Sequence, residues 1–237
     1  MNRGLWLIVA IMGITNTLWG AQVSVLCYHT FLGKPKIYTD FSLTELKQHI
    51  DTLQSHHMRF LTQEQFDSGH YTGTKNVLII IDDGNISGYK AYQSVLKPAH
   101  IQPIFAIYPN IISHVGYAMT WDQLRELLVD HCGMACHGFY HLFLTEKFAQ
   151  KDPKGFNQEI VRSKQILENK LGIKINYFVY PFGVVSPVAK TTIQKTGYRY
   201  AFSLKAKPTE IHEDPFDMPR YMMTRSMAKS ILKQVTQ

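Results

Sequence analysis

The chain has 237 residues, which is enough for one large domain with a substantial core. Its composition, with 45% hydrophobic and 18% charged residues, excludes a disordered protein. Its formal net charge is +7, but lysine and arginine are dispersed and form no basic run. We therefore expect anionic envelope surfaces, and not nucleic acid, as its charged surroundings. Three cysteines exclude a disulfide-stapled scaffold, leaving either buried thiols or a single bridge between Cys132 and Cys136.

The first 21 residues have the layout of a secretory signal peptide. A basic residue, Arg3, precedes an apolar run at 5–14, and the small residues Gly20 and Ala21 come before the polar Gln22. The run is short for a membrane anchor, and polar residues at 15–17 interrupt it. We expect removal of residues 1–21 on export to the periplasm, the cell envelope or the extracellular space. The mature domain would be 22–237, still basic and without a membrane span.

Short β-rich runs alternate with helical patterns through the rest of the chain. Three pairs typical of a capping box, Ser42 with Glu45, Thr62 with Gln65 and Thr120 with Gln123, predict helix starts. Further helices are expected before Pro98, from 153 to a C-terminal Gly172, and from 187 onward. The predicted strands are 23–28, 59–61, 77–81, 103–108, 134–136, 176–180, 198–204 and 217–222.

This alternation, without repeats or a linker, predicts a single α/β domain. The simplest architecture is a distorted β/α barrel of about seven parallel strands. In such barrels the C-terminal ends of several strands supply the site. Residues that follow a strand are therefore the candidates for function.

The central strand, 77–81, is a continuous apolar run followed directly by Asp82, Asp83 and Gly84. Such a run is typical of a parallel strand buried on both faces. Two adjacent carboxylates repel each other, and they tolerate one another best with a cation or a proton between them. The alternative is an ordinary Asp-Gly turn after a strand.

Other strand ends carry residues that could complete a site with this pair. His137 and His141 follow a short strand and are four residues apart, with a glycine and two aromatic residues between them. Two imidazoles and a carboxylate are a standard three-ligand set for catalytic Zn²⁺, although histidine pairs at this spacing also occur without any function. Further candidates at strand ends are His29, the turn from Tyr180 to Gly183, and Arg220.

These motifs carry a resemblance to a known family. Ile81-Asp82-Asp83-Gly84, His137-Gly-Phe-Tyr-His141 and Tyr180-Pro-Phe-Gly183 resemble, in this order, the first three motifs of the polysaccharide deacetylases of carbohydrate esterase family 4. Tyr28-His29 and Pro219-Arg220 further resemble the branch that includes the poly-N-acetylglucosamine deacetylases. The resemblance extends over about 23–222, nearly the whole mature chain.

The resemblance implies a zinc-dependent or similar metal-dependent hydrolase that removes acetyl groups from an N-acetylated glycan. It implies that Asp83, His137 and His141 bind the metal, that Asp82 is the general base, and that a protonated histidine serves the leaving amine, for which we assign His29. A backbone N–H at Phe182 would receive the oxyanion. The aromatic residues Tyr180, Phe182 and Trp121 are candidates for stacking on sugars, with a core position as the alternative, above all for Trp121.

The chain departs from the family pattern at two places. Many members carry an arginine in the third motif that holds the catalytic carboxylate, and this chain has Val179 there. Arg220 could replace it only if it reaches Asp82. The usual Thr-Phe before the aspartate pair is Ile80-Ile81. These departures leave open a non-catalytic glycan-binding protein that keeps the barrel, and a metal-dependent hydrolase of a small amide. The particular glycan, the metal and the oligomeric state are left open as well.

Overall fold

The structure is a computed structural model, which describes residues 21–210 and 214–237. The predicted signal peptide, apart from Ala21, lies outside the described residues. Within the described residues, none of the helices combines the length and the apolar character that crossing a bilayer requires.

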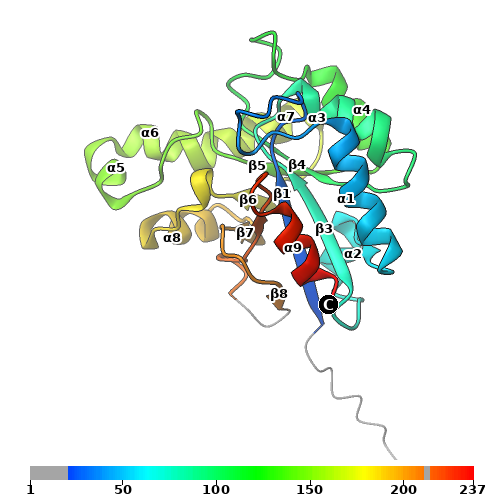
Figure 1. The fold of residues 1–237 in the computed structure, drawn as a ribbon. Coiled ribbons are helices and arrows are strands. Elements are labelled where there is room, and N and C mark those ends of the chain that lie inside the picture. The colour runs from blue at the N-terminus through cyan, green and yellow to red at the C-terminus, as the bar shows by residue number, and fades with distance from the viewer. Residues whose placement is uncertain (1–20, 211–213) are drawn as a thin grey trace, which may run out of the picture.

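One sheet runs through the molecule, with β1 (Gln22–Tyr28) and β3 (Asn76–Ile81) side by side at its centre (Figure 1). The remaining strands are β2 (Arg59–Phe60), β4 (Ile104–Ile107), β5 (Gly133–Cys136), β6 (Tyr177–Val179), β7 (Tyr200–Phe202), β8 (Thr209–Glu210) and β9 (Tyr221–Met222). Their order is β7-β6-β5-β4-β3-β1-β8, with β2 paired to the start of β3 and β9 paired to β1. Every pair is parallel except β1 with β8.

The sheet curls into a distorted barrel, which confirms the predicted class of a single α/β domain. A parallel bridge between Phe202 and Met218 joins the end of β7 to the segment that leads into β9. Because β9 pairs with β1, this segment connects the two sides of the curled sheet. The antiparallel β8 was not predicted.

The two faces of β3 explain its unbroken apolar sequence. Val77, Ile79 and Ile81 pack into the cluster that lies under the helices, whereas Leu78 and Ile80 pack into a second cluster among residues of the other strands. All five are at most 2% exposed. A strand with alternate side chains in two apolar layers has no polar face, so its carboxyl end is where polar groups can first appear.

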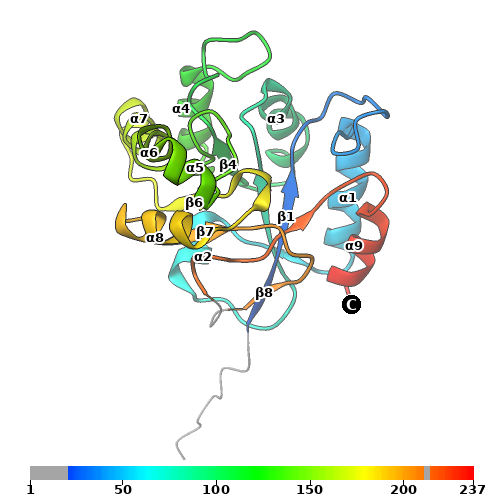
Figure 2. The same cartoon turned by 90° about the vertical axis from the view of Figure 1, so that its left-hand side faces the viewer.

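Helices surround the sheet (Figures 1 and 2). The three predicted capping boxes are present, each with both reciprocal hydrogen bonds, at the starts of the first, second and fourth helices. The α-helices are α1 (Leu43–Ser55), α2 (Gln63–Ser68), α3 (Ile86–Ala91), α4 (Trp121–Val129), α5 (Glu146–Lys151), α6 (Pro153–Asn157), α7 (Ser163–Leu171), α8 (Pro187–Lys195) and α9 (Ala228–Val235).

The helices differ from the sequence-based prediction in two respects, their π-helical turns and two additional helices. The helix expected from 153 to Gly172 contains a π-helical turn at Gln158–Arg162, which separates α6 from α7. A similar turn, Tyr92–Leu96, follows α3. Two helices, α5 and α9, were not predicted, and α9 packs beside α1 on one flank of the molecule (Figure 2).

All three cysteines are buried free thiols, so the alternative of a bridge between Cys132 and Cys136 is not realised.

Candidate active site

The carboxyl ends of several strands open into one cavity of about 370 Å³, which we call the strand-end cavity. β1 is followed by His29, β3 by Asp82 and Asp83, and β5 by His137. Parallel strands place these ends at the same edge of the sheet, as predicted from the sequence. All eight predicted site residues line this cavity: His29, Asp82, Asp83, His137, His141, Tyr180, Phe182 and Arg220. Their placement agrees with the expectation, while their chemical roles stay predictions.

Three of these residues form a compact triangle of possible metal ligands. The Nε2 atoms of His137 and His141 are 3.1 Å apart, and each lies 3.6 Å from Asp83 Oδ1. A tetrahedral ion with bonds of about 2.0–2.1 Å requires ligand atoms about 3.4 Å apart. Carboxylate and imidazole donors at these separations therefore fit a zinc ion or a similar divalent metal without rearrangement.

His137 is prepared for ligation by its hydrogen bond and by its burial. Its Nδ1 lies 2.7 Å from the backbone oxygen of Val179, so Nδ1 carries the proton and the Nε2 lone pair faces the cavity. Burial lowers the pKa of His137 to about 4, although the nearby Asp82 and Asp83 oppose this shift. The imidazole is consequently neutral near neutral pH, which is the form that binds a metal.

Asp82 has a different environment from its neighbour Asp83. Arg220, itself fully buried, donates from both terminal nitrogens to the two carboxylate oxygens of Asp82 at 2.9 and 3.0 Å. The Cys27 thiol donates to Oδ2 at 3.3 Å. Burial alone would raise the pKa of Asp82, but the charge of Arg220 and its hydrogen bonds outweigh burial and hold the pKa well below its usual range. The carboxylate is therefore ionised and fixed in orientation.

Arg220 reaches Asp82, so the carboxylate has an arginine partner although the third motif has Val179 in place of arginine. Val179 is fully buried at the end of β6, and its carbonyl oxygen orients His137 instead. Many members of the family that the motifs resemble have an arginine in the third motif, whereas the guanidinium that contacts Asp82 here belongs to Arg220, 138 residues away in sequence.

Glu159, which the sequence analysis missed, shapes the loop between the two histidines. Its carboxylate accepts hydrogen bonds from the backbone N–H groups of Phe139 and Tyr140 at 2.9 Å and of Leu142 at 3.3 Å. Glu159 is fully buried in the π-helical turn before α7. A side chain at Gly138 would meet Glu159 Oε2 at 2.6 Å, so only glycine fits beneath this cradle. The cradle thus holds His141 where it faces His137.

Three cavity residues other than glycine adopt left-handed backbone conformations. The φ angles are 76° at Asp83, 61° at His141 and 58° at Phe182. Residues with a Cβ atom occupy this region at a cost, and such residues cluster at functional sites. Each of these turns directs its side chain toward the cavity, whose lining includes all three residues.

Two of the aromatic candidates do not offer a ring to a ligand. Tyr180 contributes to the cavity wall, but it is 0% exposed and its hydroxyl donates to the Phe216 carbonyl at 2.9 Å. Trp121 lies at the start of α4 and is not among the residues that line the cavity. Its ring packs against the core and lies 5.9 Å from Lys170 Nζ. Phe182 is different, because it is 48% exposed.

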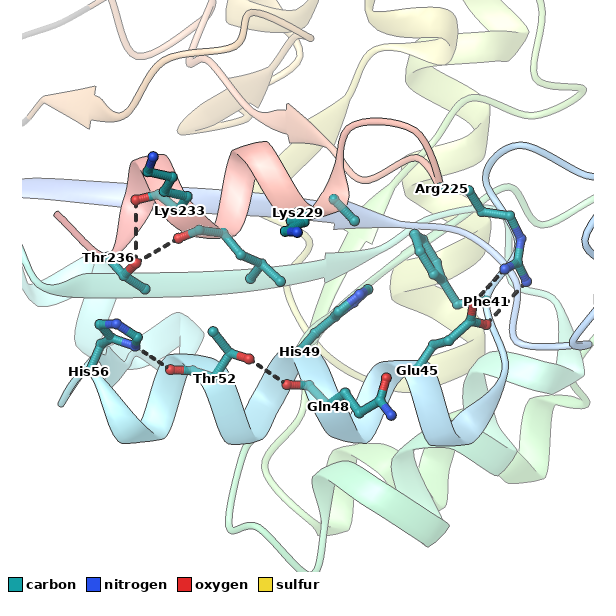
Figure 3. A pocket seen from close by; sticks show the side chains of 12 residues that line it. Phe41, Glu45, Gln48, His49, Thr52, His56, Arg225, Lys229, Lys233 and Thr236 are labelled. Carbon is teal, nitrogen blue, oxygen red and sulfur yellow. Dashed lines mark hydrogen bonds and ion pairs between the residues drawn. The ribbon is translucent and has the colours of Figure 1, made fainter.

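A second and larger cavity, about 620 Å³, lies between α1 and α9 (Figure 3). We call it the α1–α9 groove. Glu45 and Arg225 form an ion pair at one end, and His49 lies in the middle with its ring 3.2 Å from the Tyr28 hydroxyl. Its lysines, Lys229 and Lys233, are exposed on the outer face of α9. None of the eight predicted site residues lines it.

The family comparison assigns the chain to a class. The family model "Polysaccharide deacetylase" matches residues 69–201, more than half of the chain. The chain belongs to the polysaccharide deacetylase family. This membership confirms the resemblance found in the sequence motifs and makes the chain a carbohydrate-deacetylating hydrolase by class.

Individual relatives share less than a quarter of their aligned residues with this chain. A poly-beta-1,6-N-acetyl-D-glucosamine N-deacetylase of Staphylococcus epidermidis is 22% identical over 219 residues, which cover 86% of this chain and 76% of the relative. Among solved structures, IcaB from Ammonifex degensii aligns with a TM-score of 0.82 at 24% identity, covering 92% of this chain and 98% of that one. A de-N-acetylase from Aggregatibacter actinomycetemcomitans aligns with a TM-score of 0.77 at 18% identity, covering 90% and 99%. The two structures share the fold.

Proposed function

We propose that this chain is an exported, metal-dependent deacetylase that removes N-acetyl groups from a polysaccharide containing N-acetylglucosamine. The observation that carries the proposal is the triangle of Asp83, His137 and His141 beside the buried pair of Asp82 and Arg220. The similarity to the staphylococcal poly-N-acetylglucosamine deacetylase supports N-acetylglucosamine as the sugar.

Asp83, His137 and His141 would hold the metal, Zn²⁺ or another divalent transition metal. When bound, such an ion polarises the acetamide carbonyl and makes a water molecule more acidic. The neutral His137 needs no change of protonation at neutral pH to act as a ligand, which favours binding there.

The residues around the triangle supply proton transfer. Asp82, ionised and clamped by Arg220, accepts a proton from the attacking water as its oxygen adds to the acetamide carbon. His29 lies in the same cavity and donates a proton to the amide nitrogen as the carbon–nitrogen bond breaks. Acetate and the free amine of the sugar are the products. The backbone N–H of Phe182 would stabilise the negative oxygen of the tetrahedral intermediate.

Two observations favour catalysis over a non-catalytic glycan-binding protein. Val179 in the third motif and Ile80-Ile81 before the aspartate pair are the two grounds for a non-catalytic protein. On the first of them, Arg220 makes the contact that a third-motif arginine would make. Furthermore, a protein that only bound a metal would need Asp83 but not a second buried carboxylate fixed next to it.

Export is proposed from the amino-acid pattern at 1–21 alone. Expression of the full chain in a Gram-negative host, followed by fractionation and mass spectrometry, tests this. The mature protein should begin near residue 22 in the periplasmic fraction. An intact N-terminus in the cytoplasm would contradict it.

The proposed activity is tested by measuring the release of free amine from three substrates. These are chitin oligomers, β-1,6-linked N-acetylglucosamine oligomers and peptidoglycan, each with and without added metal. We expect release from the β-1,6-linked oligomers, loss of activity with a chelator and its return with Zn²⁺. Metal-independent release, or a preference for a small acetylated amide over every glycan, would overturn the proposal.

A further inference from the structure

A buried cysteine lies directly behind the proposed general base. Cys27 Sγ is 3.3 Å from Asp82 Oδ2 and 4.0 Å from His29 Nδ1. The sulfur, a carboxylate oxygen of Asp82 and a ring nitrogen of His29 all lie within 4.8 Å of one another. Sulfur, nitrogen and oxygen donors at such separations are a possible set of metal ligands, distinct from the ligand triangle described above. We call Cys27, His29 and Asp82 the thiol cluster.

Strand geometry brings the thiol cluster together. Cys27 lies on β1 and His29 follows two residues later, so their side chains point to the same side of the sheet. In the register of the two central strands, Cys27 is paired with Ile80, and Asp82 comes two residues after Ile80. This is the side of the second apolar cluster, which contains Val25 and Ile80. The interior of the curled sheet therefore ends in polar side chains that face one another.

The distances within the cluster suit an ion that binds sulfur. A tetrahedral zinc ion with a Zn–S bond of about 2.3 Å and a Zn–N bond of about 2.0 Å places sulfur and nitrogen about 3.5 Å apart. The separations of 3.3 and 4.0 Å bracket this value. Thiolate sulfur is a soft donor, which the ligand triangle lacks. The cluster therefore prefers thiophilic ions such as Zn²⁺ or Cd²⁺ over hard ions such as Mg²⁺.

The thiol proton occupies the place of such an ion. Asp82 Oδ2 accepts from the Cys27 thiol and, at 3.0 Å, from one terminal nitrogen of Arg220, while Oδ1 accepts from the other. Binding forms a metal–sulfur bond, releases the thiol proton to solvent and frees the lone pair of Oδ2 that had accepted it. That lone pair then binds the ion, and both hydrogen bonds to Arg220 are kept.

The charge of Arg220 sets the order in which the two sites fill. Its buried guanidinium is hydrogen-bonded to Asp82 itself, so a cation bound by this carboxylate meets a positive charge at close range. The ligand triangle uses Asp83 instead. The thiol cluster is therefore the weaker site, which fills after the triangle and only when free metal is in excess.

We propose that the thiol cluster is a second, inhibitory metal site, at which a thiophilic ion in excess over the first binds Cys27, His29 and Asp82. The ion holds the carboxylate and the imidazole that the proposed mechanism uses as base and acid, so it stops turnover without displacing the first ion. The inhibition rests on the proposed function, whereas the binding of the ion does not. The site confines activity to a window of free zinc concentration.

Cadmium binding tests the site without an enzyme assay. Cd²⁺ bound to a thiolate gives a charge-transfer band in the ultraviolet, so it reports on the cysteine directly. We expect His137→Ala, which disrupts the ligand triangle, to bind about one Cd²⁺ per chain with this band, and we expect no band when Cys27→Ala is added. Cys132→Ala in place of Cys27→Ala is the matched control, because Cys132 is another buried thiol, at the amino end of β5. It should keep the band.

The same titration on the parent protein, with zinc in the ligand triangle, decides the question if circular dichroism shows that His137→Ala does not fold. The band should appear in the parent and disappear with Cys27→Ala. A band that survives Cys27→Ala, or a parent protein without the band, overturns the site whether or not the protein deacetylates a glycan.

The inhibition is measured as amine release against free zinc concentration. In the parent protein the rate should rise with the first ion and fall as zinc is added in excess. Cys27→Ala should need at least about tenfold more zinc for half-inhibition, whatever its basal rate, because even an outer partner of a ligand contributes that much to metal affinity. Cys132→Ala should be inhibited like the parent. An unchanged zinc profile in Cys27→Ala contradicts the inhibitory role alone and leaves the proposed deacetylase activity intact.

Discussion

The strand-end cavity and the α1–α9 groove differ in how deeply their charged groups are buried, and this difference does not follow their volumes. The groove is the larger, about 620 Å³ against about 370 Å³, yet its lysines are exposed and its ion pair of Glu45 and Arg225 is partly exposed. In the strand-end cavity, Asp82, His137 and Arg220 are each at most 2% exposed. Buried charged groups are expensive unless they are paired, so a fold keeps them where they have a use. Burial of charge, and not volume, distinguishes the strand-end cavity, which is the one for which we propose a function.

The largest expected effect is the loss of the metal from the strand-end cavity. His137→Ala removes one corner of the ligand triangle, so bound metal should fall from about one ion per chain to nearly none, and activity should fall to background. Elemental analysis of purified protein and amine release measure the two. His141→Ala should behave alike, and full activity in exhaustively chelated protein would contradict the prediction.

The second prediction separates the two adjacent carboxylates. Asp82→Asn should keep the metal and lower kcat by about a hundredfold or more, because it removes the proton acceptor. Asp83→Asn should instead weaken metal binding, since Asp83 Oδ1 completes the triangle. Metal content and kcat measured on both variants decide the assignment. Equal metal loss in both variants would show that the roles within the pair are wrong.

The third prediction concerns His29. His29→Ala should retain fold and metal but lower turnover by about tenfold to a hundredfold, because the leaving nitrogen loses its proton donor. A general acid acts only in its protonated form, so it gives the pH profile of the rate an alkaline limb. That alkaline limb should therefore disappear in the variant. A pH profile of kcat/KM with an unchanged alkaline limb would assign the proton to another group.

The smallest effect is expected in the groove. Lys229→Ala combined with Lys233→Ala changes two exposed side chains of α9, so amine release should stay within about twofold of the parent. Initial rates on the β-1,6-linked pentamer measure this. A loss greater than tenfold would break the contrast between the two cavities and give the groove a part in binding the polymer.

Much of the fold and the cavity could be predicted because strand ends are visible in sequence. The run before Asp82 and the short strand before His137 mark two parallel strands, and parallel strands bring their carboxyl ends together. Arg220 was only a conditional candidate, because its contact with Asp82 depends on how the barrel curls. Glu159 follows Phe156 by three residues and precedes Ile160, so its position on an apolar helix face was a usable signal of a buried carboxylate.

Other elements were missed for different physical reasons. The sequence contains a signal for α9, because its buried residues recur at helical spacing: Ala228, Ile231, Leu232 and Val235. β8 has two residues and no apolar pattern, and only its pairing with Gln22 and Val23 defines it. The buried ring of Tyr180 could not be distinguished from an exposed one, because a strand end permits both.

The left-handed backbone at Asp83, His141 and Phe182 bears on how the chain would respond to heat. Residues other than glycine cost roughly 1–3 kcal/mol each in such conformations. Native domains have a free energy of unfolding of only about 5–15 kcal/mol, so three of these residues in one cavity lower it by a sizeable fraction. Under selection for heat resistance alone, glycine would be favoured at all three positions, and the side chains that line the cavity there would be lost. Backbone stability and the side chains of this cavity therefore compete at the same three backbone angles.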